Sequence, residues 1–114
     1  MTATIPEIVA FCKTVAQRVT VPEVAEELCG GPKVNPQHPD FIACPSPSHR
    51  ERHITHCSYT GSGSHGHRRF HCFSCGAKGD AVTYMAMWQG ISNFAAARQI
   101  NDYFHLNIPD PCDP

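Results

Sequence analysis

The sequence predicts an α+β fold in which a small antiparallel sheet is flanked by helices on its N-terminal and C-terminal sides. Apolar residues recur at helical spacing near both ends of the chain. The middle of the chain holds short strand-like runs separated by turns rich in Pro and Gly. Several of the seven cysteines and eight histidines stand at these turns, which suggests that a metal stabilises the sheet.

Two helices are predicted before the sheet. The first covers residues 5–19, with Thr4 as its N-cap and Pro6 and Glu7 in its first turn. The second is short, begins after Thr20, and ends at the glycine pair of residues 30–31. The wide apolar face of the first helix can pack on the core or dock a partner.

The predicted sheet lies between residues 41 and 79. Residues 41–44 read as a strand, residues 53–59 as a weakly alternating strand, and residues 68–73 as the strand that returns from a glycine-rich loop. Residues 75–79 are expected to form a tight turn.

Two further helices are predicted after this turn. Asp80 is the expected N-cap of a helix over 81–89 that Gly90 ends, and Ser92 or Asn93 should cap a last helix reaching about Phe104. The aromatic residues of these helices are assigned to the core: Tyr84, Trp88, Phe94, Tyr103 and Phe104.

Composition limits the classes of protein. With 114 residues the chain is one domain, and its net charge of −1 excludes a uniformly basic protein. Neither a secretory leader nor a membrane span is visible, so we expect a cytoplasmic protein with reduced thiols and no membrane partner. The odd number of cysteines also favours metal binding over disulfides.

The spacing of Cys72 and Cys75, followed by Gly76, is typical of a zinc knuckle. Cys44 and His49, at an earlier proline-stiffened turn, are the best candidates for the other half of a tetrahedral Cys₃His site. Such a site holds one structural Zn²⁺ and leaves no open position for catalysis, so a zinc enzyme is disfavoured. A redox pair would need a βαβ context, which is absent. Alternatives to His49 are His53, His56 and Cys57, and the remaining thiols are predicted to be buried or idle: Cys12, Cys29 and Cys112.

The near-neutral total charge conceals a basic segment. Residues 44–80 contain five arginines and lysines against two acidic residues, a net charge of +3, whereas the rest has four against eight, a net charge of −4. Such a segment can hold phosphates, with aromatics such as Tyr59, Phe70 and Phe73 available to stack bases. Strand alternation puts Phe70 in the core and Arg69 and His71 on the surface. The alternative is an ordinary solvated surface. The candidate nucleic-acid contacts are Arg50, Arg52, Arg68, Arg69, His71 and Lys78.

Residues 70–82, FHCFSCGAKGDAV, closely resemble the second knuckle of the zinc-binding domain of DnaG-type bacterial and phage DNA primases. Residues 90–97 are similar to the family's Gly-Leu-Ser-Phe-x-x-Ala segment. The resemblance implies a primase-type zinc-ribbon domain over residues 20–106, an extra N-terminal helix over 1–19, and a Pro-rich tail or linker over 107–114. The first half of the site departs from the family's Cys-x-x-His, because four residues separate Cys44 from His49.

The same resemblance implies a function in DNA replication. The family's ribbon reads single-stranded DNA template and supports primer initiation, while catalysis resides in another domain or protein whose acidic motifs this chain lacks. The expected partners are therefore template DNA, a primase catalytic domain or protein, and a replicative helicase. We expect either part of a longer primase or a free-standing relative from a phage or mobile element. The alternative is an adaptor that binds proteins through residues 5–19 and does not bind nucleic acid.

Overall fold

The structure, a computed structural model, describes residues 4–29, 41–47, 57–59 and 67–112. It confirms the predicted α+β class. Its elements, in chain order, are α1 (Ile5–Ala16), α2 (Val21–Leu28), β1 (Phe41–Ile42), β2 (Cys57–Ser58), β3 (Arg69–Cys72), β4 (Lys78–Asp80), α3 (Ala81–Gln89) and α4 (Asn93–Tyr103).

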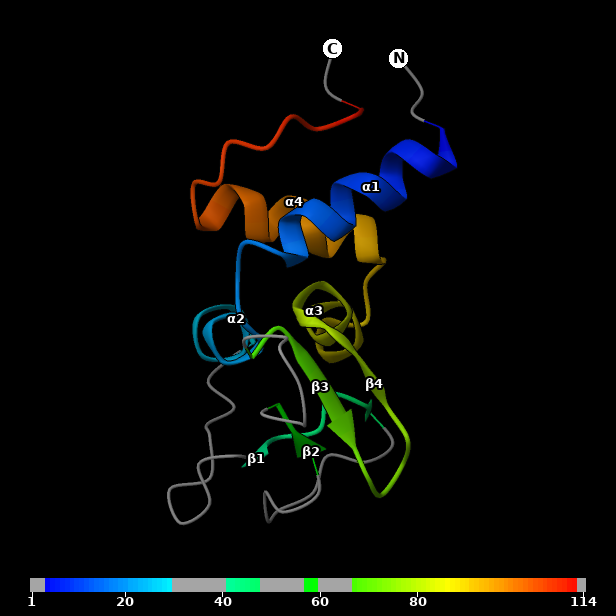
Figure 1. The fold of residues 1–114 in the computed structure, drawn as a ribbon, viewed down its shortest axis with the longest axis vertical. Helices are drawn as coiled ribbons and strands as arrows, with labels where there is room; N and C mark the ends of the chain where they lie inside the picture. The colour runs from blue at the N-terminus through cyan, green and yellow to red at the C-terminus, as the bar shows by residue number, and fades with distance from the viewer. Residues whose placement is uncertain (1–3, 30–40, 48–56, 60–66, 113–114) are drawn as a thin grey trace.

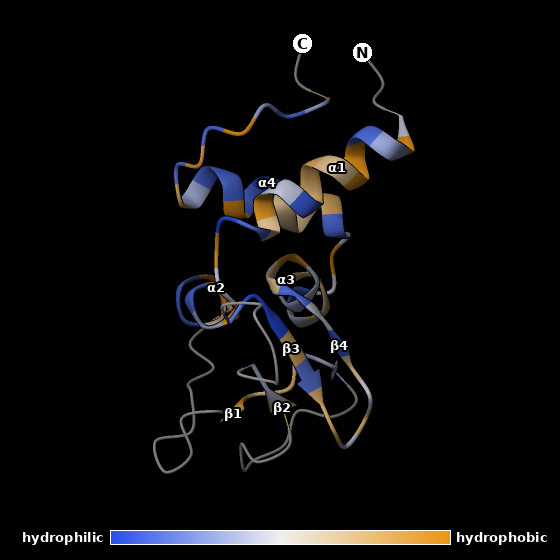
Figure 2. Cartoon of the chain, viewed as in Figure 1, coloured by the Kyte–Doolittle hydropathy of each residue, from blue (hydrophilic) through white to orange (hydrophobic). Residues whose placement is uncertain are grey.

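The elements stack along the long axis of an elongated molecule measuring 46 × 27 × 22 Å. In Figure 1, α1 and α4 lie together at one end, α2 and α3 form the middle layer, and the sheet occupies the other end. The side of α2 that faces away from α3 is hydrophilic (Figure 2). No helix within the described ranges has the length and apolar character needed to cross a membrane. The helices thus form two layers, and the sheet packs at the end of this stack.

Both N-terminal helices begin with a capping box. The Thr4 hydroxyl accepts from the Glu7 amide at 3.3 Å, and the Glu7 carboxylate accepts from the Thr4 amide at 3.0 Å. Thr20 and Glu23 repeat this arrangement at the start of α2. Helix α1 ends at Ala16, earlier than its predicted end at residue 19, because the chain must turn before Thr20 can cap the next helix.

The C-terminal helices follow the prediction closely. Asp80 caps α3, its carboxylate accepting from the Thr83 amide at 2.9 Å, and Gly90 ends that helix in the left-handed region. Ser92, rather than Asn93, caps α4 by accepting from the Ala95 amide at 3.1 Å. The capping residues could be predicted from the sequence because a helix cap depends only on neighbouring residues.

The core joins α1 to α4 and both to α3. The Phe11 ring meets Phe94 edge-on at 5.7 Å, and Tyr84 is fully buried. The assignment of Tyr103 to the core was wrong, since this residue is 47% exposed. Its hydroxyl donates to the Glu27 carboxylate on α2 at 2.6 Å, and this polar contact holds it at the surface.

The sheet is antiparallel throughout, with strand order β1-β2-β3-β4. Of the predicted strand over 53–59, residues 57–58 form β2, and residues 53–56 lie outside the described ranges. The turn predicted over 75–79 extends too far, because Lys78 and Gly79 belong to β4. Gly79 has φ +155°, and a Cβ there would lie 2.7 Å from the Thr83 Cγ2, so glycine allows β4 to pass directly into α3.

The segment after α4 runs back along that helix. The Asn101 side chain donates to the Ile108 carbonyl at 2.9 Å and accepts from the Ile108 amide at 3.1 Å. Arg98 adds an ion pair to Asp110 at 2.7 Å. These contacts hold residues 107–112 against the helical end of the molecule, away from the sheet (Figure 1).

Candidate metal centre

Three cysteine sulfurs converge where the sheet turns. Cys44 follows β1, Cys72 ends β3, and Cys75 lies in the turn after it; their sulfurs all lie within 4.8 Å of one another, with Cys44 and Cys75 3.5 Å apart. A disulfide would need about 2.05 Å. Tetrahedral zinc, with Zn–S bonds of about 2.3 Å, needs sulfurs about 3.8 Å apart. The sulfurs therefore suit a shared zinc ion and are too far apart for a disulfide.

The turn after β3 is stabilised by its own backbone. The Gly76 amide donates to the Cys72 carbonyl at 2.9 Å, and the Cys72 amide donates to the Ala77 carbonyl at 2.7 Å. The chain reverses at Gly76, which has φ +82°. These bonds bring Cys72 and Cys75 to the same side of the turn, as their spacing predicts.

Tyr84 of α3 braces both halves of the site. Its hydroxyl donates to the Ala43 carbonyl at 2.6 Å, immediately before Cys44. Its ring meets Phe70 of β3 edge-on at 5.2 Å. The sequence placed Tyr84 in the core but carried no signal for this bridge, because the bridge depends on how α3 packs against the sheet.

The thiols of Cys44 and Cys75 have pKa values shifted in opposite directions. Burial raises the pKa of the Cys44 thiol to about 12 and so favours its protonated form in the absence of a metal ion. At the exposed Cys75, a hydrogen bond from the Ala77 backbone lowers the thiol pKa and favours the thiolate. A metal ion would therefore displace a proton from Cys44 on binding.

The other candidate ligands are placed less fully. His49 and its alternatives His53 and His56 lie outside the described residues. Cys57, the remaining alternative, is buried in β2 directly opposite Cys72 but does not join the group of three sulfurs. Among the other thiols, Cys29 is buried, and Cys12 and Cys112 are half-buried.

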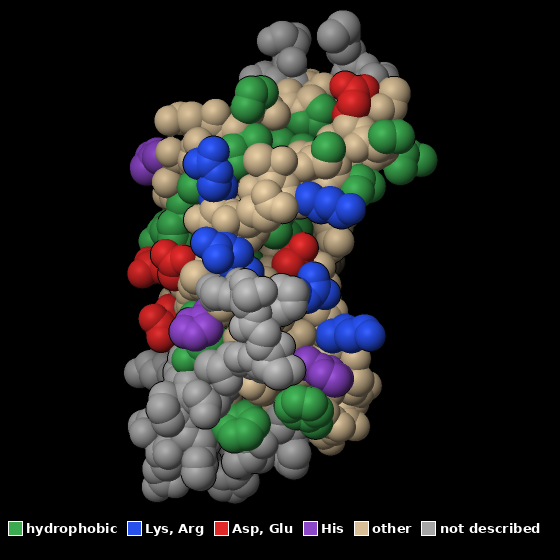
Figure 3. Space-filling model, viewed as in Figure 1, with side chains coloured by type: hydrophobic (Ala, Val, Ile, Leu, Met, Phe, Trp, Pro, Cys, Tyr) green, Lys and Arg blue, Asp and Glu red, His purple; other side chains and the backbone are tan. Residues whose placement is uncertain are grey.

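A basic face lies beside the cysteine group. Phe70 is only 2% exposed, whereas Arg69 and His71 are on the surface, which confirms the predicted alternation. Lys78 of β4 pairs directly with His71 and is also exposed, so it shares this face. In Figure 3, Lys and Arg side chains are spread over this face and include a group along its right edge, while several acidic side chains lie at the left near α2. We call Arg69, His71 and Lys78 the β3–β4 basic face.

Arg68 has a structural contact as well as an exposed position. Its Nε donates to the Gln17 carbonyl at 2.9 Å and so ties the start of β3 to the end of α1. The neighbouring His67 carbonyl accepts from the Val21 amide at 2.8 Å. The remaining candidates, Arg50 and Arg52, lie outside the described residues.

Comparison with protein-family models finds one described as the CHC2 zinc finger, the zinc ribbon of DnaG, which matches residues 9–113. The chain belongs to this family. No curated protein and no solved structure matched it. Membership confirms the resemblance seen in the second knuckle. Together with the three-sulfur group, it identifies zinc as the metal that this CHC2 zinc finger is suited to bind.

Replacing Cys72 and Cys75 together with serine should abolish zinc binding and unfold the sheet. Structural zinc binds zinc-finger peptides with about 10–16 kcal/mol, and here that energy would be folding energy. Zinc content and hydrogen exchange of β1–β4 would measure the effect. The matched control is the double variant Cys12→Ser with Cys112→Ser, which removes two thiols outside the group and should keep its zinc. Full zinc retention in the first variant would contradict the assignment.

Proposed function

We propose that this CHC2 zinc finger is the template-binding module of a DNA primase system. It would bind single-stranded DNA through the β3–β4 basic face and support primer initiation, with primer synthesis performed by another domain or protein. The observation that carries this proposal is the shared exposure of Arg69, His71 and Lys78 on one side of the sheet, beside the cysteine group. Cations on a rigid surface can bind successive phosphates along the backbone of a single strand.

The proposed metal site holds one structural Zn²⁺ through Cys44, His49, Cys72 and Cys75. Its support is the convergence of three sulfurs and the family's CHC2 description, which fits one cysteine, one histidine and two cysteines in chain order. When bound, the zinc supplies cohesion to the sheet and performs no chemistry on a substrate. The cysteines and Tyr84 then keep the β3–β4 basic face in a fixed shape.

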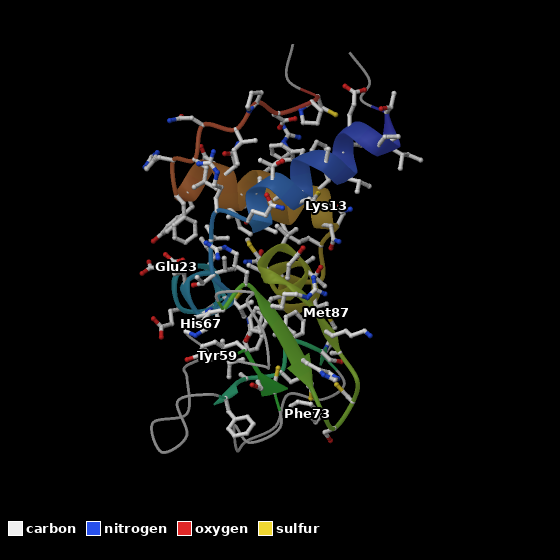
Figure 4. All side chains as sticks on the ribbon, viewed as in Figure 1. Lys13, Glu23, Tyr59, His67, Phe73 and Met87 are labelled. Carbon is white, nitrogen blue, oxygen red and sulfur yellow. The ribbon has the colours of Figure 1, made fainter. Side chains whose placement is uncertain are left out.

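The charge distribution supports a bound strand on the sheet side of the molecule. Exposed Glu23, Glu26 and Glu27 lie on α2, and Figure 4 shows the labelled Glu23 on the left flank, away from Phe73 at the lower end of the sheet. Phosphates would be repelled from that flank and attracted to Arg69 and Lys78. A primase catalytic domain or protein and a replicative helicase are the partners that such a module would serve.

An adaptor function is the second candidate, and it is favoured by α1. Ile5 is 78% exposed and Val9 is 45% exposed, one helical turn apart on the same side of the helix. In that case the zinc ribbon would serve as a scaffold, and DNA binding would be absent.

Separate substitutions test the fourth zinc ligand. His49→Ala should lower zinc affinity strongly, because removing one of four ligands leaves an open and hydrated position. The matched controls His53→Ala, His56→Ala and Cys57→Ser should retain zinc. Competition against a chromophoric chelator reports each affinity. Strong zinc loss in one of the controls, with His49→Ala unaffected, would reassign the ligand.

Removing Arg69 and Lys78 together should weaken the binding of a single-stranded oligonucleotide. Each cation on a phosphate of a single strand contributes about 0.7 to the slope of log affinity against log salt, so the slope should become shallower by about 1.4. Fluorescence anisotropy between 50 and 200 mM salt measures this slope.

The matched control for that experiment is Lys13→Ala with Arg18→Ala, which removes the same charge from α1 and the segment after it. It should leave the slope close to that of the unmodified protein. Absence of any affinity in the unmodified protein at low salt, together with capture of a protein partner lost on Ile5→Ser and Val9→Ser, would favour the adaptor instead.

A further inference from the structure

Phe73 exposes its ring at the turn between β3 and β4. The side chain is 66% exposed, and Figure 4 places it at the end of the sheet farthest from the helices. A single exposed apolar residue is ordinary on a protein surface. The surroundings of this ring make it different from the exposed Ile5 and Val9 of α1.

The backbone beneath the ring is held firmly. Phe73 follows Cys72 and precedes Cys75 by two residues, so both neighbouring sulfurs belong to the converging group. The Cys72–Ala77 and Gly76–Cys72 backbone hydrogen bonds close the turn. A ring on such a turn loses little conformational entropy when a ligand covers it, which favours binding.

A second ring lies next to Phe73, and two cations share the exposed face of the strands with that second ring. The His71 ring is 4.5 Å from the Phe73 ring, tilted by 45°. Lys78 of β4 lies directly opposite His71 of β3. Arg69 lies two residues before His71 in β3, and its side chain is therefore on the same face. Aromatic faces beside cations are the two elements that single-stranded nucleic acid uses.

The other ribbon aromatics considered for stacking are occupied. Phe70 is buried against Tyr84. Tyr59 is half-buried, and its ring meets His67 edge-on at 5.3 Å. Among these three rings, Phe73 is therefore the one whose surface is open.

We propose that Phe73, supported by His71, is a stacking platform for an unpaired base, while Arg69 and Lys78 hold the adjacent phosphates. This inference rests on the proposed function and specifies its ligand. A base can cover the ring only when it is not paired and stacked within a duplex, so the platform selects single strands over duplex DNA.

The test compares Phe73→Leu with Phe73→Trp on two oligonucleotides. One is an ordinary single strand, and the other is an abasic strand of equal length that keeps the phosphates without the bases. Phe73→Leu keeps an apolar side chain but loses the π-face, so it should bind the ordinary strand about 5- to 150-fold more weakly, the value of one stacked base. Its affinity for the abasic strand and its salt slope should stay unchanged.

Phe73→Trp should retain binding of the ordinary strand. The control Tyr103→Leu removes an exposed aromatic at the helical end and should leave both affinities unchanged. Zinc content and circular dichroism verify that each variant is folded.

Each failure has a distinct pattern. Unchanged affinity of Phe73→Leu for the ordinary strand, with normal salt dependence, would overturn the stacking platform while leaving the proposed function intact. Equal weakening on the ordinary and abasic strands would also overturn it. If the unmodified protein bound neither strand at low salt, the proposed function itself would fail, and the platform with it.

Discussion

The structure depends on the convergence of Cys44 with Cys72 and Cys75. Cys44 lies 28 residues before Cys72 in the chain, and the strands next to the two halves of the group, β1 and β3, are only two and four residues long. Strands this short cannot hold a sheet by backbone hydrogen bonds alone. A zinc ion shared by the three sulfurs would link β1 to β3 directly, and Tyr84 reinforces the same link through Ala43 and Phe70.

The helices and the sheet of this small chain have different roles. The helices supply most of the apolar core, in which Phe11 and Tyr84 are buried and against which Phe94 packs, while β3 and β4 present polar and basic side chains on their exposed face. The net charge of −1 is consequently an average over a basic sheet and acidic flanks. A protein of nearly neutral composition can therefore still offer a local surface suited to phosphates.

Local patterns were readable from the sequence because neighbouring residues decide them. The capping residues Thr4, Thr20 and Asp80 were identified, and strand alternation placed Phe70 inward and Arg69 outward. The paired cysteines of the knuckle were found from their spacing, and the three sulfurs do meet.

Features that depend on contacts between residues distant in the chain could not be predicted from the sequence. Strand β4 was missed because Lys78 and Gly79 form a strand only by pairing with β3, and their composition resembles a turn. The exposure of Tyr103 depends on Glu27 in another helix, and the Arg68 contact depends on where α1 ends. The role of Tyr84 in bracing the site likewise required the tertiary arrangement.

We propose that zinc, bound by three cysteines and one histidine, organises the sheet. X-ray absorption spectroscopy at the zinc edge of the purified protein tests it most directly. A Cys₃His site should show three sulfur neighbours at about 2.3 Å and one nitrogen at about 2.0–2.1 Å. A first shell of four sulfurs, or one dominated by oxygen, would contradict it.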